Sequence, residues 1–184
     1  MFSRLFRWRP AVGASADTLY QSVVAQARTP GFYADLGVPD TVDGRFDMVV
    51  LHVFLVLRRL KGQGEAAEAL SRMLVERMVK DMDLSLREMG TGDTGVGRRV
   101  ETMVSGLYGR INAYDAALAS GEARPLRAAL DRNLYGTVLE ASPEHLDRMA
   151  GYMRREAASL ERQSVENLMA GTVRFGAPPG GDEF

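Results

Sequence analysis

Residues 43–60 read DGRFDMVVLHVFLVLRRL, and this stretch decides the fold. Between Met48 and Leu57 every residue except His52 is apolar, so a helix here is apolar on all of its faces. Such a helix belongs in the centre of a protein, because a surface helix keeps one polar face. A bilayer span needs about 20 apolar residues, and this run has about half that number. The stretch therefore predicts a central, buried helix and no membrane span.

The rest of the chain also favours helices. Apolar residues recur at intervals of three and four within residues 17–28, 65–89, 95–119, 125–135 and 143–169, and no stretch shows the alternation expected of strands. Ser142 followed by Pro143 is a typical helix start. We expect an all-α fold: a single compact helical domain of six or seven helices, covering residues 15–170. A basic-aromatic segment (residues 1–14) precedes it, and a flexible, Gly/Pro-rich tail (residues 171–184) follows it.

The composition excludes several classes of protein. The 184 residues carry 23 basic and 24 acidic side chains, a net charge of −1, so the charge does not favour nucleic acid as a direct ligand. The absence of Cys excludes disulfides, thiolate metal sites and a Cys nucleophile. The two histidines, His52 and His145, are too few for a His-rich metal site. The first ten residues lack the pattern of a secretion signal, so we expect a cytoplasmic protein.

The Gly-rich loop at residues 90–97, GTGDTGVG, imitates two nucleotide-binding motifs. Both motifs work only between a strand and a helix, where backbone N–H groups converge on phosphate. Here a helix is expected before the loop, and Arg98 and Arg99 replace the Lys and the Ser or Thr of a phosphate loop. We interpret the loop as a helix–helix connector that binds no nucleotide. A weaker anion site with Arg98 and Arg99 stays open.

The candidates for catalysis have structural explanations. Asp40, Asp43 and Asp47 lie near one another if their turn is helical, but capping and ion pairing with Arg45 or another Arg explain them. His52 is expected to be a core histidine with a hydrogen-bond partner. We therefore expect no catalytic residue, no cofactor and no metal, and no enzymatic activity. The remaining alternative is an enzyme with an unrecognised carboxylate site.

The N-terminal segment interleaves apolar and basic residues. On a helical wheel its apolar side chains share one broad arc and two Arg residues lie opposite, a pattern that suits an anionic membrane surface. The residues expected to contact the membrane are Phe2, Arg4, Leu5, Phe6, Arg7 and Trp8. The alternative is a frayed end whose Phe or Trp packs onto the domain.

Residues 65–89 carry an unusual ladder of Met and Leu on one helical face. Such a face suits a groove that accepts varied apolar helices, because the thioether of Met is flexible and polarizable. The residues expected to form this client-binding groove are Leu70, Met73, Leu74, Arg77, Met78 and Met82. The alternative is that the fold buries the ladder, in which case Met only fills the core.

Ordered blocks of this chain resemble the ubiquinol–cytochrome c chaperone family. GVPDT at residues 37–41 and DGRFD at 43–47 are two of them. The other blocks lie at residues 19–20, 24–28, 32–33, 51–55, 81–83, 85–90, 92–93, 96–97, 108–110 and 113–114. The resemblance covers roughly residues 17–140.

The resemblance implies a non-enzymatic assembly chaperone for the cytochrome bc1 complex. Its expected partners are newly made cytochrome b or another bc1 subunit, an anionic membrane surface and, by analogy with mitochondrial relatives, a second assembly factor and the ribosome. Because no long Arg- and Ser-rich presequence precedes the shared region, the chain resembles the bacterial branch. We therefore expect it in the cytoplasm, peripheral on the inner membrane. The alternative is a non-catalytic membrane-surface interaction or regulatory protein without a cytochrome b client.

Overall fold

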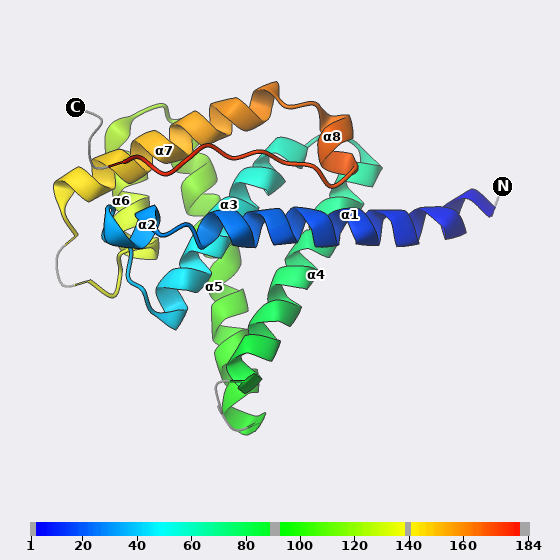
Figure 1. Cartoon of the computed structure of the whole chain (residues 1–184), viewed down its shortest axis with the longest axis horizontal. Helices are drawn as coiled ribbons and strands as arrows, with labels where there is room; N and C mark the ends of the chain where they lie inside the picture. The colour runs from blue at the N-terminus through cyan, green and yellow to red at the C-terminus, as the bar shows by residue number, and fades with distance from the viewer. Residues whose placement is uncertain (1–2, 89–92, 139–140, 181–184) are drawn as a thin grey trace.

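The computed structural model describes residues 3–88, 93–138 and 141–180, with side chains for residues 12–88, 101–102, 104–138 and 141–180 (Figure 1). These residues form eight helices and no strand, which confirms the all-α prediction. Six helices are long, and α2 and α8 are single turns. The helices are α1 (Ser3–Ala27), α2 (Gly31–Ala34), α3 (Val42–Leu60), α4 (Glu65–Glu88), α5 (Asp93–Ala119), α6 (Ala123–Asn133), α7 (Pro143–Arg162) and α8 (Val165–Met169).

Helix α3 lies at the centre, as its apolar run predicts. Helices α1, α4, α5 and α7 pack around it, and residues 50–56 are at most 1% exposed. The helix begins at Val42, one residue before the predicted start, where the Thr41 hydroxyl oxygen accepts a hydrogen bond from the Gly44 amide at 3.1 Å. Arg58 and Arg59 lie in its last turn, where positive charge favours the helix dipole.

The turn before α3 depends on two glycines. Gly37 has a φ of 62°, a conformation that other residues rarely adopt. A Cβ atom at Gly44 would overlap the carbonyl oxygen of Pro39, so the chain can enter α3 at this angle only with Gly in that position. These contacts give a structural reason for the GVPDT and DGRFD sequences.

Two helix boundaries differ from those predicted. Helix α1 begins at Ser3 and not near residue 17, and its first turns extend beyond the other helices (Figure 1). Asp17 therefore lies in the interior of α1. The last helix, predicted to reach Met169, ends at Arg162, and Ser164 starts α8 by accepting a hydrogen bond from the Asn167 amide at 3.2 Å. Ser142 precedes α7, as predicted, but makes no side-chain capping bond.

The C-terminal residues also differ from the loose tail expected from residue 171. Residues 171–180 run in an extended path along α1 and α7 (Figure 1), and we call them the strap. The strap is held largely through its backbone: the Gly176 amide donates to Glu156 at 2.8 Å, and its carbonyl accepts from Gln26 at 2.7 Å. Val173 is buried and Phe175 packs against the core. Composition alone does not reveal these bonds, because they use main-chain atoms.

Candidate functional site

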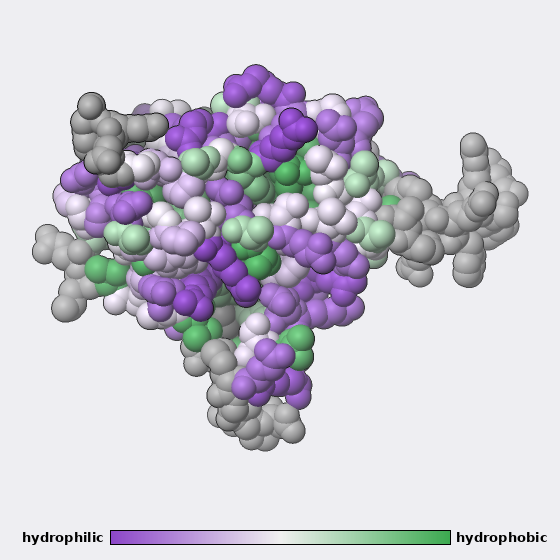
Figure 2. All heavy atoms as spheres, viewed as in Figure 1, coloured by the Kyte–Doolittle hydropathy of each residue, from purple (hydrophilic) through white to green (hydrophobic). Residues whose placement is uncertain are grey.

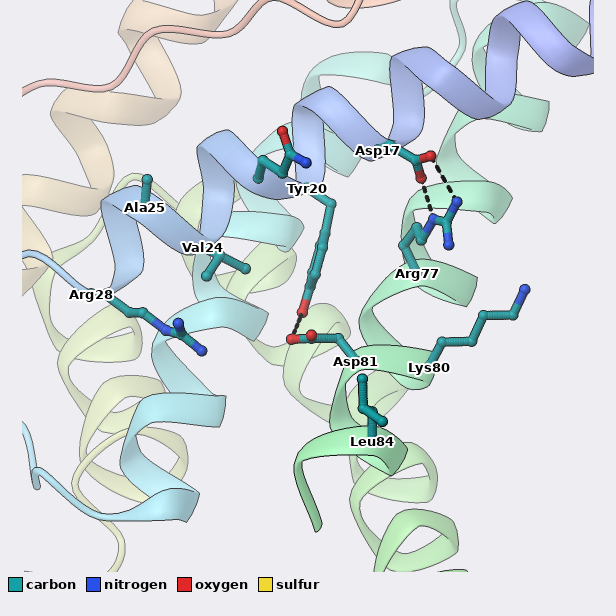
Figure 3. Close-up of a pocket in the computed structure, with 10 residues that line it drawn as sticks. Asp17, Tyr20, Val24, Ala25, Arg28, Arg77, Lys80, Asp81 and Leu84 are labelled. Carbon is teal, nitrogen blue, oxygen red and sulfur yellow. Dashed lines mark hydrogen bonds and ion pairs between the residues drawn. The ribbon is translucent and has the colours of Figure 1, made fainter. Parts of the chain in front are cut away.

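A cleft opens where α1 passes α4 (Figure 3). Its first hollow, of about 640 Å³, lies between one face of each helix, and the side chains that shape it include Tyr20, Val24, Arg28, Arg77, Lys80 and Leu84. A second hollow, of about 310 Å³, extends over α3. Tyr20, Arg28 and Asp81 line both hollows, which are therefore adjacent. We call the two hollows together the α1–α4 cleft.

Two contacts between α1 and α4 hold the cleft in shape. The Tyr20 hydroxyl donates a hydrogen bond to Asp81 Oδ2 at 2.8 Å. Burial, with a smaller contribution from this bond, raises the pKa of Tyr20 above its ordinary value, so the hydroxyl stays protonated and remains the donor. Nearby, the Arg77 guanidinium binds both carboxylate oxygens of Asp17, with Nη2 at 2.7 Å from Oδ2.

The second hollow has an apolar lining and a mixed rim. The apolar side chains that line it are Val42, Phe46, Val49, Met78, Met82 and Leu86. At the edges of the cleft, Val42 is 39% exposed and Leu84 is 55% exposed. Figure 2 shows small apolar areas between hydrophilic ones on this face of the molecule. Apolar side chains bordered by charged ones are typical of protein interaction sites.

The ladder on α4 does not form the open groove wall predicted from the sequence. Leu70 and Leu74 are fully buried, Met78 is 1% exposed and Met82 is 6% exposed, because this face of α4 packs on α1 and α3. Met73 is half-buried and packs against the same core. Most of the ladder therefore fills the core, while Met78 and Met82 line the floor of the second hollow. Arg77 lines the cleft, as predicted, but its charge is paired with Asp17.

The sequence analysis missed most residues of the cleft. Tyr20, Phe46 and Asp81 come from three helices and Arg28 follows the end of α1. The partners Tyr20 and Asp81 are 61 positions apart. A signal for them did exist: these four residues lie within the blocks at 19–20, 24–28, 43–47 and 81–83 that resemble the family. The structure brings these separate blocks together around one cleft.

The acidic cluster before α3 makes ion pairs, as its structural interpretation predicts. Asp40 binds Arg45 at 2.6 Å, and Asp47 lies 3.0 Å from Nε of Arg110 on α5, without the alignment of a hydrogen bond. Burial raises the pKa of Asp47 to about 7, against the lowering effect of Arg110. The Tyr114 hydroxyl, also on α5, is buried without a hydrogen-bond partner in the structure. The Asp47–Arg110 pair ties α3 to α5, whereas Arg45, which binds Asp40, lines the second hollow of the cleft.

His52 is a buried core residue with hydrogen-bond partners, as predicted. Its Nδ1 lies 2.8 Å from the Met48 carbonyl oxygen, which can only accept, so Nδ1 carries the proton. Its Nε2 therefore accepts from the Tyr152 hydroxyl at 2.8 Å, and the Tyr152 oxygen accepts from Gln26 at 2.9 Å. Burial lowers the pKa of His52 to about 4, so the ring is neutral near pH 7. This network joins α1, α3 and α7, and the ring of Phe175 from the strap packs against it.

Some predicted residues lie outside the described part of the chain. Phe2 and residues 89–92 are among them, and so are the side chains of Arg4, Leu5, Phe6, Arg7, Trp8, Arg98 and Arg99. The predictions of membrane contact and of a loop that binds no nucleotide therefore stay predictions. Among the side chains that are described, no group of His, Asp and Glu is arranged to hold a metal ion. No helix in the described ranges is both long and apolar enough to cross a bilayer.

Comparison with known proteins agrees with this fold. Residues 34–175 match the family model described as ubiquinol-cytochrome C chaperone. The crystal structure of the Cbp3 homolog from Brucella abortus superposes with a TM-score of 0.82 at 38% identity, covering 96% of this chain and 97% of the other.

Curated relatives are more distant in sequence. The mouse ubiquinol-cytochrome c reductase complex assembly factor 1 is 27% identical over 170 residues, 92% of this chain and 56% of the relative. The yeast mitochondrial protein CBP3 is 28% identical over 152 residues, 81% of this chain and 45% of the relative. The chain thus spans about half the length of these two relatives. With most of its length matched by the family model, the chain belongs to the ubiquinol–cytochrome c chaperone family.

Proposed function

We propose that this protein is a non-enzymatic assembly chaperone for the cytochrome bc1 complex, and that it holds a segment of newly made cytochrome b in the α1–α4 cleft. Its family and the names of its relatives, which are assembly factors of ubiquinol–cytochrome c reductase, support the chaperone role. The choice of cytochrome b as client follows from the resemblance of the sequence to that family.

The composition of the α1–α4 cleft carries the proposal. Blocks of sequence that resemble the family are far apart in the chain, and yet they meet around the second hollow, where they contribute most of the lining residues. The hollow combines a Met-containing apolar floor with charged side chains at the rim. A chaperone for a membrane protein needs such a surface, because it must cover an apolar segment for a time and then release it.

We further propose that the protein works at the cytoplasmic surface of the inner membrane. The apolar and basic residues at the start of α1 support this location, because their pattern suits an anionic lipid surface. The first turns of α1 extend beyond the other helices, so they reach outward without moving the domain (Figure 1). Removal of residues 1–10 is expected to release the protein from anionic vesicles.

Deletion of the gene in its own host, followed by complementation, tests the proposal. The deletion should lower spectroscopic cytochrome b and bc1 activity, and the wild-type gene should restore both. Leu84→Glu places a charge at the exposed rim of the cleft and should fail to restore them. Val138→Glu makes the same change at another exposed apolar residue, outside the cleft, and should restore them.

Two results would contradict the proposal in different ways. Normal cytochrome b and bc1 activity in the deletion strain would exclude the chaperone role and favour a membrane-surface protein without this client. Full restoration by Leu84→Glu at wild-type protein levels would retain the role but exclude the cleft as its site. Co-purification of cytochrome b from detergent extracts then identifies which client, if any, the protein holds.

A further inference from the structure

In the first hollow of the α1–α4 cleft the acidic side chains have partners, but two of the basic side chains have none among the described residues. Both acids that line the first hollow have partners: Asp17 binds Arg77, and Asp81 accepts the hydrogen bond of Tyr20. Two of its cations, Arg28 and Lys80, make no hydrogen bond or ion pair with any described residue. The formal charges of Asp17, Arg28, Arg77, Lys80 and Asp81 sum to +1 in this hollow, although the chain as a whole carries a net charge of −1.

These two cations come from separate segments of the chain and lie at the edges of an apolar surface. Arg28 follows the C-terminal end of α1 and lines both hollows of the cleft, whereas Lys80 is on α4, one helical turn before the exposed Leu84 (Figure 3). Val24, on the facing side of α1, completes the apolar part of this hollow. A segment that covers Val24 and Leu84 thus brings its own edges close to Arg28 and Lys80.

We propose that the segment held in the α1–α4 cleft is an amphipathic helix with acidic side chains beside its apolar face, and that Arg28 and Lys80 select it. This inference rests on the proposed function, in which the cleft holds the client. The apolar face would cover Leu84 and Val24, while its carboxylates pair with the two free cations. Opposite charges at such a rim favour the correct partner and speed its association, while like charges exclude others.

The concave shape of the cleft favours a protein segment as its occupant. The half-buried Tyr20 and the buried Met82 lie recessed between the helices, where a helix inserted lengthwise can contact them. A flat bilayer surface would touch the rim alone. Anionic lipid is therefore the competing occupant, and the experiment below distinguishes it from a peptide.

Two synthetic peptides test this inference on the full-length protein. Both are labelled 18-residue amphipathic helices with the same Leu-rich apolar face, and they differ only in carrying Glu or Lys on the polar face. Fluorescence anisotropy in 50 mM NaCl should show that the Glu peptide binds about tenfold more tightly than the Lys peptide, as two surface ion pairs predict. The preference should decrease at 500 mM NaCl, because salt screens exposed charges.

Charge-reversal variants locate the effect. The Arg28→Glu/Lys80→Glu double variant should reverse the preference, whereas Arg72→Glu/Arg132→Glu should keep it. The control pair makes the same change of charge at two exposed cations outside the cleft. Circular dichroism should give equal melting temperatures for the two variants, because all four residues are exposed.

Four outcomes would overturn the inference, three of them in the binding experiments. One is equal binding of the two peptides to the wild type, and another is an unchanged preference in the Arg28→Glu/Lys80→Glu variant. The third combines two results: neither peptide binds the protein, and the Arg28→Glu/Lys80→Glu variant loses binding to vesicles of 30% phosphatidylglycerol. Together these results would assign the cations to lipid. If instead the variant still restores bc1 activity fully while Leu84→Glu does not, the charge selection fails and the proposed function stands.

Discussion

Replacement of His52 by Gln should change how the stability of the protein depends on pH. Burial lowers the pKa of His52 to about 4 in the folded state, from an ordinary value of 6.5. The unfolded chain therefore binds a proton as the pH falls from about 6.5 towards 4, while the folded chain resists it, and acid reduces the free energy of unfolding. Between pH 7 and pH 5 the two pKa values give a roughly twentyfold shift towards the unfolded state, or about 2 kcal/mol.

The hydrogen bonds around His52 explain why protonation is resisted. A charged ring would need an acceptor at Nε2, but the Tyr152 oxygen already accepts from Gln26, and its proton points to the ring. Urea unfolding should show that the free energy of unfolding falls by about 2 kcal/mol more in the wild type than in His52→Gln between pH 7 and pH 5, since all other titrations are common to both proteins. Equal losses would show that His52 accepts a proton in the folded state, and would refute the network as described.

Three further predictions concern the core and the turn before α3. Met78→Ala should lower the free energy of unfolding by about 2–5 kcal/mol, because Met78 is buried, whereas Leu84→Ala at an exposed position should change it by less than about 0.5 kcal/mol; equal effects in urea unfolding would contradict the burial of the ladder. Asp47 has its pKa raised to about 7, so its ionisation costs stability as the pH rises from about 4 to 7. Between pH 6 and pH 8 the free energy of unfolding should therefore fall by about 1 kcal/mol more in the wild type than in Asp47→Asn. A parallel pH dependence of the two proteins would contradict the raised pKa. Gly44→Ala should destabilise the protein by about 1–3 kcal/mol through overpacking against the Pro39 carbonyl, measured by thermal melting, and an unchanged melting temperature would show that the turn adjusts freely.

The elements that sequence analysis predicted well are those with a strong local signal. Residues 43–60 were placed within one residue of α3, because an apolar run of this length has few alternatives to a buried helix. The start of α1 was missed, because Pro10 and Gly13 interrupt residues 3–16 and disfavour a continuous helix there. The break before α8 was also missed: Leu160 and Leu168 are both buried and suggest one continuous helix, but the chain turns between them at Gln163 and Ser164.

The cleft was harder to predict than the fold, for a physical reason. A period of three or four identifies the buried face of α4 but does not say whether another helix of the same chain or a separate protein covers it. Here α1 and α3 cover most of that face, so the ladder became core. The pairing of Tyr20 with Asp81, which shapes the cleft, depends on how α1 lies across α4, and no local pattern encodes that arrangement.

Helix α1 links the buried network to the cleft. Gln26 faces α7 and the strap, where it binds the Tyr152 hydroxyl and the Gly176 carbonyl. Arg28, two residues later, lines the cleft on α4. The end of α1 is thus fixed from the side of α7 while it presents a free cation to the other side. Weakening of the network, by protonation of His52 or loss of the strap, would therefore move Arg28 relative to Lys80, and the charges that we propose to select the client would lose their spacing.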